Sequence, residues 1–154
     1  MTKTIAIPAL AAVALVLPAV TRADEPKKAG PMAVFFTPTD LKWTDVPNAA
    51  GVKMAVVTGN PSKGAGHFFI KFPGGFSAPE HHHTANHYVA VMQGTLVIGV
   101  DGKDHTLPTG SFFSFTGEKK HTTKCAEGAE CVISIDSRGM WDVVPSAAPG
   151  APAK

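Results

Sequence analysis

The sequence has little charge: Asp, Glu, Lys and Arg make up 17% of its 154 residues, and 14 basic residues are nearly balanced by 12 acidic ones. Two of the basic residues, Lys3 and Arg22, stand in the first 23 positions, which hold no acid, so the rest of the chain is formally neutral. That balance excludes the basic surface with which proteins bind nucleic acid or anionic lipid. With 44% hydrophobic residues, 15 Gly and 13 Pro, the chain is also unlike a coiled coil or a disordered protein. One turn-rich domain with a single core is expected.

Long hydrophobic runs are also scarce, because only residues 5–20 form one. As a helix this run would rise about 24 Å, less than the roughly 30 Å hydrocarbon core of a membrane, and it contains two prolines. Small residues at Thr21 and Ala23 fit the minus-three and minus-one positions of a signal-peptidase site. We therefore expect a signal peptide over residues 1–23, cleavage after Ala23, a periplasmic or secreted protein and no stable membrane span.

Cysteine is rare, and the two residues present, Cys125 and Cys131, flank a polar five-residue segment with a central glycine. The β-type runs on either side predict a hairpin, which would bring the two sulfur atoms close together. An exported protein meets an oxidising compartment, so a disulfide is favoured over the alternative of two free thiols. Because the closed loop is short, such a bridge would contribute only about 2 kcal/mol.

Helical periodicity is absent, since no window keeps apolar residues at i, i+3, i+4 and i+7 over three turns. Short runs rich in β-branched and aromatic residues alternate instead with Gly, Pro, Asn and Asp, which predicts an all-β sandwich or barrel. We expect this domain over residues 32–144, between a flexible linker at 24–31 and a disordered Pro/Ala tail at 145–154. The predicted strands are 32–36, 52–58, 67–72, 87–92, 95–100, 112–115, 121–124, 132–135 and 141–144, with Asp101-Gly102 as a tight hairpin turn.

Histidine is concentrated in one place, with four of the seven histidines in residues 81–87. Side chains alternate between the two faces of a strand, so His81 and His83 share one face and His82 points to the other. Two imidazoles on one face can share a metal ion. Taken alone, the cluster could equally be a surface patch that binds metal adventitiously.

Further ligands would have to come from later strands. His87 opens the next predicted strand and has the parity of Val89, which places it on the inner face if the valine belongs to the core. His121 opens another strand and is the natural fourth candidate. For His67 and His105, a hydrogen-bonded or solvent-facing role is the expectation.

The spacing of these histidines resembles the first cupin motif, G-x5-H-x-H-x3,4-E-x6-G. Gly75, His81, His83 and Gly94 stand at the required intervals, and His87 occupies the position of the motif's Glu.

A weaker second motif, G-x5-P-x-G-x2-H-x3-N, keeps only its frame. Gly110 precedes His121 by eleven residues, whereas the internal Pro, the internal Gly and the final Asn are replaced by Thr116, Glu118 and Cys125. The resemblance extends over about residues 50–137.

The resemblance to cupins implies a jelly-roll barrel, the double-stranded β-helix, with one divalent metal ion inside. Cupins hold this ion by three His and a Glu, so the positions carried over, His81, His83, His87 and His121, imply the four-histidine variety. Imidazole suits several ions, and Mn, Fe, Cu, Ni and Zn all stay open. Four neutral ligands would leave the ion's charge uncompensated and favour an anionic, chelating partner.

The function implied is that of an exported metal-dependent enzyme, an oxidoreductase of the dioxygenase type that acts on a small chelating oxygen compound such as a β-dicarbonyl or a catechol. No acid or base stands out near the histidines, because Glu80 and Tyr88 have the opposite parity. Two alternatives remain: a binding or sensing module for a metal or small ligand, and a cupin whose metal is structural. A small molecule is the expected partner and nucleic acid is not. Cupins often dimerise through edge strands, and residues 32–36 could serve as such an edge.

Overall fold

The structure is a computed structural model that describes residues 33–146. The predicted signal peptide, the linker and residues 147–154 of the predicted tail lie outside the described residues. The chain divides into two compact units after Val34, and the fold below is that of the second unit. Between residues 33 and 146 no helix is long and apolar enough to cross a membrane.

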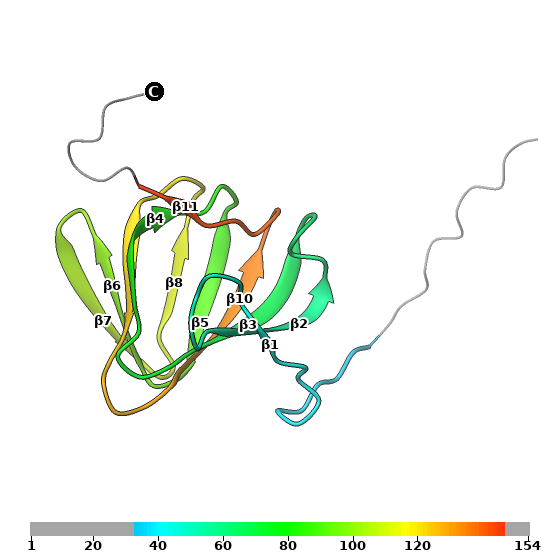
Figure 1. Ribbon diagram of the computed structural model, residues 1–154. Coiled ribbons are helices and arrows are strands. Elements are labelled where there is room, and N and C mark those ends of the chain that lie inside the picture. Colours follow the sequence, from blue (N-terminus) through cyan, green and yellow to red (C-terminus); the bar gives the residue numbers. More distant parts are fainter. Residues whose placement is uncertain (1–32, 147–154) are drawn as a thin grey trace, which may run out of the picture. The chain divides into compact units, whose positions relative to one another are not determined.

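Antiparallel strands form two sheets in the described part of the chain (Figure 1). In spatial order, the first sheet consists of β1 (Thr44–Asp45), β2 (Lys53–Gly59), β3 (Gly66–Phe72), β10 (Cys131–Ser137), β5 (His87–Gln93) and β8 (Phe112–Phe115). The second sheet consists of β11 (Val144–Pro145), β4 (Ser77–His82), β9 (His121–Cys125), β6 (Thr95–Val100) and β7 (Lys103–Pro108).

Alternation of side chains along the strands places the core between the two sheets. In β3 and β10 every second residue is buried, and β5 begins with the same pattern, as a strand with one face on a core requires. The inner faces of both sheets contribute to one hydrophobic cluster, which includes Phe68, Val89, Leu96, Ile98 and Ile135. The prediction of an all-β jelly-roll is therefore confirmed.

At the two ends of the described chain, the strands differ from those predicted. Residues 33–36 of the expected strand 32–36 form no strand, and Phe35 is 89% exposed. At the other end, the strand expected at 141–144 is reduced to β11. Pro145 pairs with His81 in that short strand, and the Ser146 N–H bonds the Glu80 carbonyl. Pro145 of the predicted tail thus lies in β11, and Ser146 after it is tied to β4 by one backbone hydrogen bond.

Two strands of the second sheet, β4 and β7, are absent from the predicted strands, although the alternation of His81 and His83 presumed a strand at β4. β7 is exposed over nearly its whole length and carries no apolar alternation, so the sequence gives no period-2 signal there. It forms because the Asp101-Gly102 turn, with positive φ at both residues, folds it back onto β6 as an edge strand. The predicted hairpin turn is thus present, although its second strand went unrecognised.

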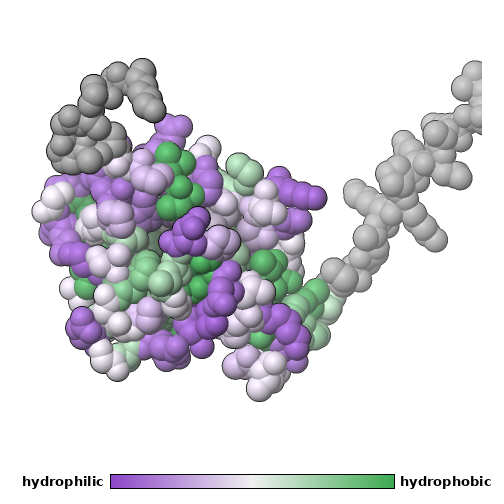
Figure 2. All heavy atoms as spheres, viewed as in Figure 1, coloured by the Kyte–Doolittle hydropathy of each residue, from purple (hydrophilic) through white to green (hydrophobic). Residues whose placement is uncertain are grey.

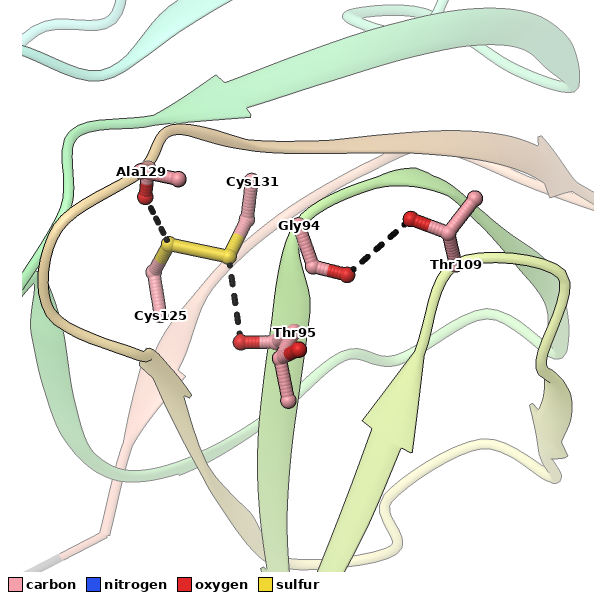
Figure 3. Close-up of a disulfide and its surroundings, with 6 residues drawn as sticks. All are labelled: Gly94, Thr95, Thr109, Cys125, Ala129 and Cys131. Carbon is pink, nitrogen blue, oxygen red and sulfur yellow. Dashed lines mark hydrogen bonds between the residues drawn. A yellow bond between two sulfur atoms is a disulfide. The ribbon is translucent and has the colours of Figure 1, made fainter.

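The predicted disulfide between Cys125 and Cys131 is present and joins the end of β9 to the start of β10 (Figure 3). Its sulfur atoms lie 3.3 Å and 3.2 Å from the carbonyl oxygens of Ala129 and Thr95. Because a disulfide sulfur carries no proton, these are close packing contacts and not hydrogen bonds. Both cysteines are almost fully buried, so the bridge closes one end of the core.

Reducing this disulfide is expected to lower the free energy of unfolding by about 2 kcal/mol, because the short loop constrains the unfolded chain only modestly. For a domain of this size that corresponds to a fall in Tm of roughly 10 °C. Thermal unfolding of the Cys125→Ser, Cys131→Ser variant beside the oxidised protein measures the effect. An unchanged Tm would show that the bridge does not stabilise the native fold.

Candidate metal centre

His81 and His121 are brought together by the pairing of β4 with β9, in which they stand directly opposite each other. The register of β4 shifts between Ala78 and His81. Pro79 lies within this irregularity, where its missing N–H leaves no gap in a regular ladder. The two imidazole centroids end up 4.4 Å apart on the inner side of the sheet.

His83 and His87 lie on either side of the connection between β4 and β5. The ring centroid of His83 is 5.1 Å from that of His81, 5.3 Å from that of His121 and 4.9 Å from that of His87. All four histidines are buried, with at most 7% of each residue exposed. The structure thus gathers them at one end of the barrel, opposite the disulfide.

Three of the four form a tight group in which one ring nitrogen from each of His81, His83 and His121 lies within 4.8 Å of the others. His87 stands slightly apart, with its ring centroid 6.2 Å from that of His121. A three-histidine site therefore fits a metal ion in this structure. The role of His87 as a fourth ligand stays a prediction.

The hydrogen bonds of the rings fix which nitrogen is free to bind. The Nδ1 atoms of His81, His87 and His121 lie 2.7, 3.1 and 2.9 Å from the carbonyl oxygens of Pro79, Ala85 and Lys119, and Nδ1 of His83 bonds the Asp142 carbonyl. A carbonyl only accepts, so each Nδ1 must carry the proton. Each Nε2 then keeps its lone pair, which is the arrangement found in metal-binding histidines.

Burial also keeps these imidazoles neutral. Desolvation lowers the pKa of all four, to about 3 for His83 and to about 4 for His121, although the hydrogen bonds to backbone carbonyls act in the opposite direction. Neighbouring imidazoles lower these pKa values further, because charging one ring disfavours charging the next. At neutral pH a metal ion would not have to displace protons from the cluster.

A segment that precedes β11 supports His83 from two sides. The indole of Trp141 stacks on the His83 ring with centroids 3.8 Å apart, and it meets the His87 ring edge-on at 5.2 Å. The Asp142 carboxylate accepts hydrogen bonds from the Thr84 N–H at 2.8 Å and from the Thr84 hydroxyl at 2.6 Å. Burial raises the pKa of Asp142, but the two Thr84 bonds, together with the residue's own N–H and the nearby His83, hold the pKa below its usual value. The charged carboxylate therefore holds the loop that carries His83 in place through two hydrogen bonds to Thr84.

Replacing Asp142 by alanine is expected to weaken metal binding about 10- to 100-fold, because partners that orient a ligand without touching the metal contribute on this scale. The loss would come from a displaced main chain at residue 142, whose carbonyl orients His83. Competition with a metal indicator measures the affinity. As a matched control, Asp136→Ala removes only an exposed ion pair with Arg138 and should leave it unchanged. Equal affinity for both variants would refute this role of Asp142.

The remaining histidines lie away from the cluster. His82 is half-buried and does not line the cavity that the four histidines share, and His105 is exposed on β7. His67 forms a hydrogen bond of 2.9 Å between its Nε2 and the Ser134 hydroxyl on the outer face of the first sheet.

Sequence reasoning missed Trp141 and Asp142, because nothing near them in the chain indicates contact with a segment almost sixty residues earlier.

The four histidines line a cavity of about 680 Å³ between the two sheets. Most of its other lining residues are aliphatic or aromatic. The only carboxylate among them is Asp142, and no Lys or Arg of the described chain lines it. This is the arrangement of a small-molecule site, in which a few polar groups converge in an apolar pocket.

Comparison with known proteins shows a match of residues 68–136 to the Cupin domain family. Among solved structures, KdgF from a Halomonas species is 23% identical, with a TM-score of 0.56 over 68% of this chain and 94% of its own. The polyketide cyclase RemF from Streptomyces resistomycificus is 16% identical, with a TM-score of 0.63 over 77% of this chain and 89% of its own. A predicted oxalate decarboxylase from Thermotoga maritima is 18% identical, with a TM-score of 0.57 over 70% and 98%. A search of curated protein sequences finds no match.

Residues 68–136 are thus similar to the Cupin domain family, as the histidine spacing implied, and the solved structures share the fold. The identities with the solved structures are low, so these structures establish the jelly-roll fold and not the activity.

Proposed function

We propose that this chain, whose fold is that of a cupin, is an exported metal-dependent enzyme acting on a small molecule that binds through two chelating oxygens. The observation that carries the proposal is the cluster of buried imidazoles, each with Nδ1 committed to a carbonyl, at the wall of an apolar cavity of about 680 Å³. A purely structural metal would need no cavity beside it.

The donor set fits a first-row transition ion. His81, His83 and His121 would hold it, with His87 as the fourth ligand of the proposed site. When bound, such an ion supplies a Lewis acid for the substrate oxygens and, if it is redox-active, electrons for dioxygen. Because all ligands are neutral, an anionic substrate head would balance its charge.

The protein's own contribution is orientation and the exclusion of water. Asp142 is the only acid or base in the cavity wall besides the histidines, and Thr84 already occupies its carboxylate. Among the described residues, the wall thus offers little acid–base chemistry beyond the histidines themselves. Among the reactions of chelating oxygen compounds, we favour oxidation by dioxygen, since it needs least from side-chain acids and bases.

Oxygen consumption tests this proposal. The protein loaded with Fe²⁺ or Mn²⁺ is expected to consume dioxygen when given a β-diketone such as acetylacetone, or a catechol, and to lose this activity in the His121→Ala variant. If no member of such a panel is turned over with any of the metals, the enzymatic reading is wrong.

A binding or sensing module is the second candidate. The observation in its favour is the same lack of a free acid or base in the cavity wall. Tight, metal-dependent binding of the chelating compounds without turnover would establish it in place of the enzyme.

A further inference from the structure

The inward-facing side chains of β5 and β9 are histidines at one end of the barrel and mostly apolar beyond it. Along β5 the next inward residues after His87 are Val89 and Val91, and along β9 His121 is followed by Thr123 and then by the disulfide. Two residues of strand advance about 7 Å. The polar cluster is therefore confined to one end, and the apolar lining continues through Val89 to Phe72 and Leu96, which pair with the two cysteines of the disulfide.

The cavity follows this apolar wall and does not stop at the histidines. Its lining combines inward residues of both sheets, among them Val52, Ile70, Phe72, Leu96, Ile98 and Ile133. All six are buried. Apolar surface inside a partly open cavity gains free energy when an apolar ligand covers it. A cavity of this size with such a lining indicates a site for a hydrocarbon group.

The lack of charged side chains along the apolar part of the cavity limits which ligands can bind there. No Lys or Arg of the described chain lines the cavity, and its one carboxylate, Asp142, lies beside the histidines. A second charged group at the far end of a ligand would therefore be buried without a partner, at a high free-energy cost. Dicarboxylates and other compounds charged at both ends do not suit this wall.

The lining also includes residues that are partly or fully exposed, so the cavity reaches the surface there. Val46, Asn48, Ala49 and Ala50 come from the loop before β2, and Ser77, Ala78 and Pro79 come from β4. Figure 2 shows hydrophobic and hydrophilic residues interspersed over the face that it draws, with several hydrophobic ones near the middle.

We propose that the apolar half of the cavity is a subsite for an uncharged hydrocarbon chain or ring. The substrate is thus an amphipathic compound with a chelating oxygen head at the histidines and an apolar body toward the disulfide. The position of the head rests on the proposed function above, whereas the apolar subsite rests on the cavity wall.

Calorimetry with a graded series of ligands tests the apolar subsite separately from the binding of the chelating head. The protein loaded with Zn²⁺ is titrated with straight-chain hydroxamates, from acetohydroxamate to octanohydroxamate, which share one chelating head. Each added methylene is expected to strengthen binding about fourfold, as full burial of a CH2 group predicts. The gain should level off once the chain spans the wall. A chain of equal length that ends in a carboxylate should lose most of the gain.

A pair of variants on neighbouring positions of β10 locates the subsite. Ile133 points into the cavity, whereas Val132 precedes it with the opposite parity. Ile133→Phe should remove most of the gain from the long chain and leave acetohydroxamate binding unchanged. Val132→Phe should change neither. If Ile133→Phe does not fold, the ligand series with the unaltered protein still decides the question.

The outcomes distinguish the two proposals. Affinity that depends on Zn²⁺ but does not rise with chain length would overturn the apolar subsite and leave the metal site standing. Affinity that rises with chain length but is the same with and without Zn²⁺ would support the subsite and contradict the chelating head.

Discussion

Replacing His121 by alanine is expected to abolish stoichiometric metal binding, with a loss of affinity of more than about 100-fold. His121 is one of three residues whose ring nitrogens converge within 4.8 Å, and the loss of a direct ligand should exceed the 10- to 100-fold effect of its outer partners. Equilibrium dialysis with Zn²⁺ or Ni²⁺, followed by elemental analysis, measures the stoichiometry.

His82→Ala is the matched control for this experiment, because His82 stands between two candidate ligands and has the opposite parity. It should retain one metal ion per chain at unchanged affinity. If the His82 variant lost the metal and the His121 variant kept it, the binding site would be a surface patch on the 81–83 run and not the interior cluster.

Replacing Gly94 by alanine is expected to destabilise the fold by about 3 kcal/mol or more. Gly94 has a φ of +80°, and a Cβ atom there would lie 2.5 Å from the Glu130 carbonyl oxygen and 3.1 Å from the sulfur of Cys131 (Figure 3). The left-handed backbone alone costs about 1–2 kcal/mol for a residue with a Cβ, and the collision with backbone adds to it. Denaturant unfolding measures the difference.

Gly110 supplies the control, since its φ is +88° and a Cβ there would meet nothing within 4 Å. Gly110→Ala should cost only the backbone term of about 1–2 kcal/mol. Equal costs at the two positions would show that the contact with the start of β10 does not matter. The required glycine of the first motif is thus explained by the close approach of β10 to the turn after β5.

The sequence predicted most of the fold because most strands carry a local signal. The β6 and β8 ranges are as predicted, and the inward parity of β5 follows from its valines. β7 lacked that signal because it is an exposed edge strand, and residues 33–36 looked like a strand only because they are apolar.

The site was predictable to the extent that ligands lie on alternating positions of strands. The grouping of His81 in β4 and His83 just after it with His121 at the start of β9 follows from parity and motif spacing. Trp141 and Asp142 could not be predicted, because their roles arise from a chain crossing that places them against His83 and Thr84. The cavity could not be predicted either, since sequence shows which side chains point inward but not whether they fill the space.

X-ray absorption at the metal edge of the protein loaded with one equivalent of Zn²⁺ tests the convergence of the histidines most directly. The expected spectrum contains three or four imidazole nitrogens at about 2.0–2.1 Å from the ion. A coordination shell of oxygen atoms alone, or with a single imidazole, would show that the interior cluster does not bind the metal and would contradict both the site and the function built on it.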